Sequence, residues 1–195
     1  MQRPFAKYLR AAAAMIAGLA LGLAATAVSL RTGYGFGAMR VGPWTAWPQI
    51  GGADIDPYAR AMLSRSGEAP LGREQGLAFI ARADSSGERL DGRCEYRILD
   101  QAPPARFWTL SVAAPSGALL ANLSGRHVFT SADILRREGG DFEIAVANSA
   151  RAGNWLAIGA VRDFVLVLRL YDTPFDVDAR HEASSFPRIV KTACA

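Results

Sequence analysis

The stretch Asp163-Phe-Val-Leu-Val-Leu-Arg-Leu-Tyr171-Asp-Thr-Pro174 decides the fold class of this 195-residue chain. Residues 164–171 are almost all apolar, and β-branched and aromatic side chains of this kind are typical of strands. The run is too short for an ordinary buried helix, and it is bounded by Asp and Pro, which favour turns. It therefore predicts a largely buried β-strand, interrupted by one charged residue, Arg169.

Similar short runs precede this strand, and turn signals such as Asp84-Ser-Ser-Gly87 and Pro115-Ser-Gly117 separate them. The runs on either side of the first turn predict a hairpin with a Gly-containing loop. No long amphipathic helices alternate with the runs, so the pattern favours a mainly β, antiparallel sandwich or jelly roll over a βαβ fold. The expected strands span 77–83, 93–99, 107–112, 118–121, 128–130, 142–147 and 164–171.

One or two short helices are expected beside the strands. Asp54-Ile-Asp56-Pro57 supplies an acidic N-cap and a Pro at the first helical position, so a helix follows over 58–63 and stops near Gly67. A second short helix is expected at 131–137.

The Gly-, Pro- and aromatic-rich stretch before the first helix has neither a helical nor an alternating period, which predicts an irregular linker over 31–53. Trp44 and Trp47 in this linker suit a membrane interface. The alternative, which we favour, is that they cover the domain by packing on it.

An uncharged run, Ala11–Leu30, lies between a basic N-terminus with Arg3, Lys7 and Arg10 and a single cation, Arg31, on its far side. Its length matches the roughly 20 residues that a helix needs to cross a bilayer. The positive flank is expected to stay in the cytoplasm. The run therefore predicts a single-pass protein of the cytoplasmic (inner) membrane whose domain faces the periplasm.

The same run also fits a signal peptide, because Ala25-Thr26-Ala27 is a small-residue site that suits cleavage after Ala27. We favour the uncleaved anchor, since the run exceeds the usual apolar region of a signal peptide. Gly18 and Gly22 form a GxxxG spacing that permits helix dimers, but this spacing arises easily by chance in Ala-rich sequence. The expected organisation is 1–10 basic region, 11–30 transmembrane helix, 31–53 linker and 54–195 β domain.

The net charge of +4 reports topology and not nucleic-acid binding. All acidic residues follow Arg31, and the excess of cations lies entirely in residues 1–31, so the exported part is formally neutral. A neutral domain has no positive field for nucleic acid. Expected partners are the membrane through 11–30 and an envelope protein, lipid or glycan.

Four motifs in order carry a resemblance to a known family. They are Asp84-x-x-Gly87-x-x-Leu90-x-Gly92-x-x-x-Tyr96, Pro103-Pro-Ala-Arg-Phe-Trp-Thr-Leu110, Gly153-Asn-Trp-Leu156 and Leu168-Arg-Leu-Tyr171. Over roughly residues 44–194 the chain resembles the exported bacterial proteins grouped as domain of unknown function 1214. The resemblance implies a jelly-roll-like β domain in the membrane or envelope, and it implies no established activity, substrate or cofactor.

Cys94 and Cys194 are the two cysteines of the chain. In an oxidising compartment an even pair predicts one disulfide. The alternative is a buried Cys94 and a free thiol on a frayed tail.

Polar and aromatic residues of these motifs are candidates for a small ligand groove. Arg169 either meets a carboxylate such as Asp84 or reaches into the groove toward an anionic ligand. A structural role for the set, with Trp and Tyr packing in the core or at its rim, is the interpretation we favour. The candidates are Asp84, Trp108, Asn154, Trp155, Arg169 and Tyr171.

Catalytic and metal-binding patterns are sparse, and no cofactor or metal site is expected. His127 and His181 are the two histidines, and neither belongs to a metal-spaced cluster. Asp84 and Asp91 flank one turn and form the best carboxylate pair. The preferred function is a non-enzymatic binding or structural module of the envelope. The alternative is an envelope enzyme acting on a carbohydrate or ester, with Asp84, Asp91 or His127 as acid or base.

Overall fold

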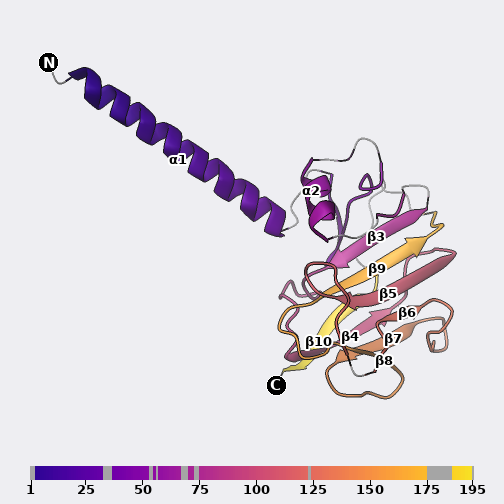
Figure 1. Ribbon diagram of the computed structural model, residues 1–195. Helices are drawn as coiled ribbons and strands as arrows, with labels where there is room; N and C mark the ends of the chain where they lie inside the picture. Colours follow the sequence, from indigo (N-terminus) through magenta and orange to yellow (C-terminus); the bar gives the residue numbers. More distant parts are fainter. Residues whose placement is uncertain are drawn as a thin grey trace.

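The computed structural model describes residues 3–32, 37–52, 55, 57–66, 70–72, 75–122, 124–174 and 186–194. In Figure 1 a long helix, α1 (Arg3–Thr32), leads into a β domain that carries one short helix, α2 (Pro57–Ser66). The mainly β fold and the N-terminal helix of membrane-span length confirm the sequence-based prediction. The strands are β1 (Met39–Val41), β2 (Trp44–Ala46), β3 (Gly76–Ala81), β4 (Cys94–Asp100), β5 (Phe107–Ala113), β6 (Val128–Thr130), β7 (Phe142–Ala147), β8 (Asn154–Ala157), β9 (Val165–Tyr171) and β10 (Arg188–Cys194).

Within the described residues the strands form two sheets that pack face to face. The six-stranded sheet has the order β1-β2-β3-β9-β5-β6, and the four-stranded sheet has the order β10-β4-β7-β8. Neighbouring strands pair antiparallel, except that β7 and β8 run parallel. This parallel pair departs from the expected all-antiparallel sandwich. Strand β9 lies between β3 and β5, which explains why its sequence is apolar at nearly every position.

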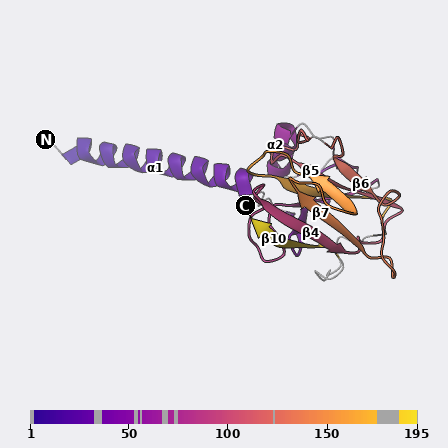
Figure 2. The ribbon, with the colours of Figure 1, turned by 90° about the horizontal axis from the view of Figure 1, so that it is seen from below.

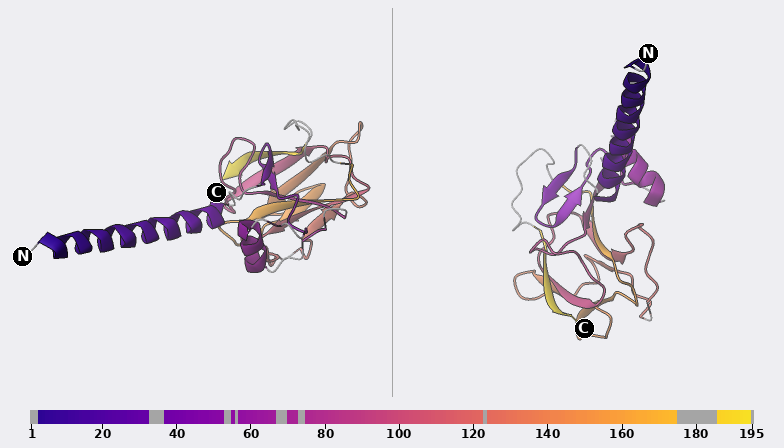
Figure 3. Two further views of the ribbon diagram at one scale, coloured as in Figure 1. Left: turned by 90° about the horizontal axis from the view of Figure 1, so that it is seen from above. Right: turned by 90° about the vertical axis from the view of Figure 1, so that its left-hand side faces the viewer.

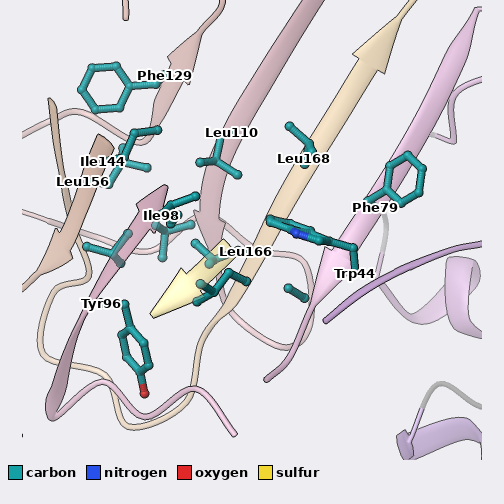
Figure 4. Packing of buried hydrophobic residues seen from close by; sticks show 14 of the residues in the cluster. Trp44, Phe79, Tyr96, Ile98, Leu110, Phe129, Ile144, Leu156, Leu166 and Leu168 are labelled. Carbon is teal, nitrogen blue, oxygen red and sulfur yellow. The ribbon is translucent and has the colours of Figure 1, made fainter. Parts of the chain in front are cut away.

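The core lies between the two sheets, as Figure 4 shows. Side chains alternate along a strand, so Leu166 and Leu168 of β9 face the four-stranded sheet and meet residues such as Ile98 of β4. Val165 and Val167 point the other way and belong to a second, smaller buried cluster on the outer face of the six-stranded sheet. Figure 2 places α2 on that outer side.

The predicted hairpin of 77–83 with 93–99 is wrong, because β3 and β4 lie in different sheets. The turn exists, but it closes on itself: Ala83 bridges Arg89, and Leu90 N donates to the carbonyl oxygen of Arg82 at 3.1 Å. Gly92 then lets the backbone pass close to Val161, since a Cβ at this position would lie 2.0 Å from the carbonyl oxygen of Val161. The turn residues thus stabilise only the short loop between Arg82 and Leu90, and they do not determine which longer strands pair.

Two further expected elements are absent from the described residues. At 118–121 there is only a single bridge, from Leu119 to Ala113. At 131–137 there is no helix, because the side chain of Asn154 binds both the N–H and the carbonyl oxygen of Leu135, which a helix would have used itself. A tight turn in which Asp133 accepts from Thr130 N at 2.6 Å begins this stretch.

The expected irregular linker contains two strands, since β1 and β2 form a hairpin that extends the six-stranded sheet. Trp44 is fully buried and donates from Nε1 to the carbonyl oxygen of Pro187 at 2.8 Å, and Trp47 is 6% exposed. Both therefore pack on the domain, as favoured above. Strand β10 was missed in the sequence, and α2 begins at Pro57 as predicted, with Asp54 and Asp56 outside the described residues.

Helix α1 projects from the β domain as a separate rod, as Figures 1 to 3 show. Its segment Lys7–Ser29 is long and apolar enough to cross a membrane, and none of its apolar window is buried within the described part of the chain. A helix with apolar side chains on all its faces and no protein around it suits a lipid environment or a signal sequence.

Candidate functional site

Three side chains form a row across the outer face of the first strands of the six-stranded sheet. Arg40 in β1 lies opposite Thr45 in β2, and Thr45 lies opposite Ile80 in β3. Since Trp44 and Phe79 point into the core, alternation directs the row to the outer face. The result is one wall with a cation, a hydroxyl and an apolar group.

The loop of residues 82–89 follows β3 and forms a second wall. Asp84 is 3% exposed, and its Oδ1 accepts hydrogen bonds from Ser86 N at 2.9 Å, Ser86 Oγ at 2.6 Å and Glu88 N at 3.0 Å. A carboxylate that binds backbone N–H groups two and four residues ahead fixes a tight turn. Gly87 completes it with a φ of +90°, a conformation that glycine adopts readily.

Strand β10 holds this loop in place from behind. Ser85 N donates to the carbonyl oxygen of Ile189 at 2.9 Å, and Ile189 N donates to Ser85 Oγ at 2.9 Å. Lys191 of the same strand forms an ion pair with Glu88 of the loop. The shape of the loop therefore depends on a strand that lies about a hundred residues away in sequence.

The predicted disulfide secures that strand. Cys94 and Cys194 lie opposite each other in the pairing of β4 with β10, and their sulfur atoms are bonded at 2.03 Å. The far end of β10 is thus fixed covalently to the four-stranded sheet.

The two walls line an open pocket of about 610 Å³, a volume within the range of small-molecule sites. We call it the hairpin pocket, because the β1–β2 hairpin and the 82–89 loop form it. Its lining residues are Arg40, Gly42, Pro43, Thr45, Trp47, Ile80, Arg82, Ala83, Asp84, Ser85, Ser86, Gly87 and Arg89.

Positive charge predominates in the hairpin pocket, where Arg40, Arg82 and Arg89 stand against one carboxylate, Asp84. Burial, together with the like charge of Arg89, lowers the pKa of Arg82. Among the described residues, the side chains of Arg82 and Arg89 have no ion pair and no hydrogen bond. Two arginines that line one pocket without an acidic partner in the described part of the chain favour a bound anion.

Trp47, which also lines this pocket, carries a hydrogen-bond donor without a partner in the described structure. Its Nε1 is buried and has no partner among the described residues, whereas Trp44 and Trp155 donate to the carbonyl oxygens of Pro187 and Ala147. A buried donor left unpaired costs about 1–3 kcal/mol. A ligand that accepts this hydrogen bond would recover that cost.

The six sequence-predicted groove residues do not converge. Trp108 packs in the core with its ring 5.1 Å from that of Phe142. Asn154 is buried in β8, where its Nδ2 donates to the carbonyl oxygens of Leu135 and Glu143, and Trp155 lies half-buried beside it. Each of these side chains packs or forms hydrogen bonds within the domain.

The other candidates lie on or near the six-stranded sheet. Arg169 is half-buried on the outer face of β9, level with Ala78 and Thr109, and the ring of Tyr171 lies 5.8 Å from that of Phe107. Asp84 lies beyond the end of β3. Of the six, Asp84 lines the hairpin pocket and the other five do not.

The expected acid–base residues lie apart from one another. Asp91 does not line the hairpin pocket, and the hydrogen bond from the Arg93 guanidinium lowers the pKa of Asp91 to about 2. His127 lies outside the pocket as well, with Nδ1 3.1 Å from Asn122 Nδ2. His181 falls outside the described residues, within which no group of three or more His, Cys, Asp or Glu side chains is placed to hold a metal ion.

Sequence reasoning did not identify Arg40, Arg82 or Arg89, and it interpreted Trp47 as a residue that covers the domain and not as part of a pocket. Arginine supplies nearly all the cations of this chain, so no single one stands out. One sequence signal could have placed Trp47 in a surface pocket. Side chains alternate along a strand, so in Trp44-Thr-Ala-Trp47 the second indole lies on the face opposite the first.

Comparisons with known proteins agree with the fold and add no activity. The model of a family described as "Protein of unknown function (DUF1214)" matches residues 75–175, just over half of the chain. The VPA0106 protein from Vibrio parahaemolyticus is similar in structure, with a TM-score of 0.55 and 18% identity over 72% of this chain and 36% of that one. An uncharacterized protein from Burkholderia cenocepacia matches with a TM-score of 0.41 and 20% identity, over 74% and 46% of the two chains.

The chain spans less than half the length of each of these two solved proteins. Among curated proteins none matches the chain. The likeness to the Vibrio protein supports the sandwich fold alone.

Proposed function

We propose, from the premise that this chain belongs to the DUF1214 family of proteins of unknown function, that it is a membrane-tethered binding module of the bacterial envelope. Helix α1 holds the β domain at the periplasmic face of the cytoplasmic membrane. The hairpin pocket receives the ligand. The observation that carries the proposal is the hairpin pocket itself, which has a small-molecule volume and is built by the segment next to the membrane span.

The tether is supported by the length and exposure of α1. Lys7–Ser29 covers the thickness of a bilayer core, and apolar side chains point outward all around it. Lys7 and Arg10 on one side and Arg31 on the other favour a cytoplasmic N-terminus by excess of positive charge.

The tether also brings the pocket close to the membrane. Only residues 33–39 lie between the end of α1 and Arg40. At roughly 3.4 Å per extended residue, the Cα of Arg40 lies at most roughly 27 Å from that of Thr32. In Figure 1 the arrowhead of β3, which leads into the 82–89 loop, points toward the end of the domain that α1 joins.

Binding accounts for the chemistry of the pocket better than catalysis. Its charged groups are three arginines, which stay protonated, and Asp84, whose Oδ1 already accepts three hydrogen bonds. A general acid or base must exchange a proton with the substrate near neutral pH. The lining offers donors that orient a ligand, and no pair of groups suited to proton transfer.

Cysteine labelling tests the tether. A cysteine at exposed Ser116 should react with a membrane-impermeant maleimide in intact spheroplasts, whereas a cysteine at Gln2 should react only after the membrane is permeabilised. The intact mass should retain residues 1–27. Release of a soluble protein that begins at residue 28 would overturn the tether.

Photo-crosslinking tests the ligand site in cells. Thr45 lines the hairpin pocket, and Thr109 lies on the outer face of the same sheet, away from it. With p-benzoylphenylalanine at position 45 we expect a discrete adduct, and at position 109 none. Equal adducts at both positions, or none at position 45, would contradict a ligand in this pocket.

A further inference from the structure

We infer that the hairpin pocket is a phosphate site. In this site Arg82 and Arg89 bind the phosphate oxygens, and Arg40 and the Trp47 N–H provide further contacts. This inference rests on the proposed function and names the chemical class of the ligand. The phosphate belongs either to a soluble phosphate ester or to the headgroup of a membrane phospholipid. Both sources share the same recognition chemistry, and the experiment below distinguishes them.

The first argument is the pairing of the arginines. Several arginines elsewhere on this domain pair with carboxylates, as Arg93 does with Asp91 and Arg188 does with Asp100. Arg82 and Arg89 have no such partner among the described residues, although each repels the other. An oxyanion between two guanidinium groups relieves that repulsion and supplies charge-assisted hydrogen bonds.

The second argument is the donor set. A guanidinium presents its N–H groups as a planar fork that matches two oxygens of a phosphate. The Trp47 Nε1–H is a neutral donor, buried and without a partner in the described part of the chain, and the Trp47 residue lines the same pocket. The hydroxyl of Thr45 lies on the same wall. The lining therefore gathers donors of several kinds around one pocket.

The third argument is the local charge. Arg82 and Arg89, which have no acidic partner among the described residues, contribute two positive charges, while Asp84 is hydrogen-bonded within its own loop. A phosphate monoester carries about −1.5 to −2 at pH 7, which matches these two charges. A carboxylate ligand carries a single charge and matches them less well. Ile80 and Pro43 give the pocket an apolar side for the remainder of the ligand.

Binding is measured on the full-length protein in phosphatidylcholine nanodiscs. Trp47 is one of four tryptophans and the one that lines the pocket, so its emission reports occupancy. The soluble probes are inorganic phosphate and glycerol 3-phosphate, titrated against chloride at matched ionic strength. The lipid probe is phosphatidic acid incorporated into the nanodisc.

We expect a saturable change in emission that is absent from Trp47→Phe, and a rise in Tm with the same probe. Arg89→Gln should weaken binding at least about tenfold, because it removes a charge-assisted pair of hydrogen bonds. The same variant should leave Tm without ligand unchanged or raised, since it removes the charge that repels Arg82. Arg106→Gln, which removes a cation from an exposed pair with Asp172, is the matched control and should bind like the wild type.

A response to glycerol 3-phosphate or inorganic phosphate assigns a soluble ligand, and a response to phosphatidic acid alone assigns a lipid. No response of the wild type to any probe would overturn the phosphate assignment, and so would equal binding by Arg89→Gln. If the crosslink at position 45 forms while every phosphate probe fails, the inference falls and the proposed function stands. If that crosslink is also absent, both fall.

Discussion

Ser85 and Ile189 exchange two hydrogen bonds, one between their backbones and one through the Ser85 hydroxyl, across 104 residues of sequence. One residue belongs to the wall of the hairpin pocket and the other to the edge strand β10. The pocket is therefore attached to the C-terminal strand, and its order depends on how firmly that strand is held. This link connects the disulfide, the loop and the site.

Removing the disulfide should loosen β10 and the pocket together. Cys94→Ser combined with Cys194→Ser opens a loop of 100 residues, which should lower the free energy of unfolding by up to about 4–5 kcal/mol by chain entropy. Urea unfolding gives the stability, and hydrogen exchange at the Ile189 amide gives the local effect. Wild-type protein treated with reductant should behave in the same way. A variant with unchanged stability and unchanged Ile189 exchange would show that β10 holds without the bond.

Asp84 should be required for the shape of the loop. Asp84→Ala leaves the N–H groups of Ser86 and Glu88 without their acceptor and should cost about 3 kcal/mol in the free energy of unfolding. Asp84→Asn keeps an acceptor oxygen and should cost clearly less. Thermal unfolding of the two variants side by side provides the measurement. If Ala and Asn prove equally mild, the carboxylate does not organise this turn.

Asn154 should be a structural residue and not a ligand contact. Its amide makes three hydrogen bonds, two to Leu135 and one to the carbonyl oxygen of Glu143, and the side chain is buried. Asn154→Ala should therefore cost about 2–4 kcal/mol. Asn148→Ala is the matched control, because Asn148 is exposed and donates one hydrogen bond, to Gly92. If denaturant unfolding shows that the two variants lose similar amounts of unfolding free energy, a structural role specific to Asn154 is contradicted.

Asp91 should stay ionised far into the acid range. The hydrogen bond from Arg93 lowers its pKa in the folded state to about 2, below the usual 3.8, so its stabilising contribution is present above about pH 4 and disappears as pH falls toward 2. In Arg93→Gln the pKa of Asp91 should rise toward 3.8, and the acid limb of the stability curve should flatten. Carboxyl-carbon NMR titration reads the pKa directly. A pKa near 4 in the wild type would show that Arg93 does not hold this carboxylate.

The apolar runs predicted the centre of the fold well. Strand β9 lies between two neighbours and is apolar on both faces, so its sequence alone reveals it. Strand β10 pairs on one side, and most of its side chains are exposed, so Arg188–Cys194 shows no apolar period. Strands β1 and β2 have three residues each, too few for an alternating pattern to be recognised.

The pocket was beyond sequence reasoning for a different reason. Arg40 and Arg82 come together because the β1–β2 hairpin pairs with β3, and this non-local pairing was not predicted. The predicted hairpin of 77–83 with 93–99 pointed to the wrong partner. Asp84 was recognised as a turn residue by its local pattern, and the disulfide was inferred from compartment and cysteine count. The sequence therefore predicted the turn and the disulfide, but it did not predict which strands distant in sequence would pair.

The most direct measurement is native mass spectrometry of the full-length protein released from its own membranes. Thr45→Trp fills the hairpin pocket from its wall, and Thr109→Trp places the same bulk on the same face away from it. The account predicts a bound small molecule of discrete mass on the wild type and on Thr109→Trp, and its loss from Thr45→Trp. A wild type without bound mass, or the same bound mass at equal occupancy on Thr45→Trp, would contradict a ligand in the hairpin pocket.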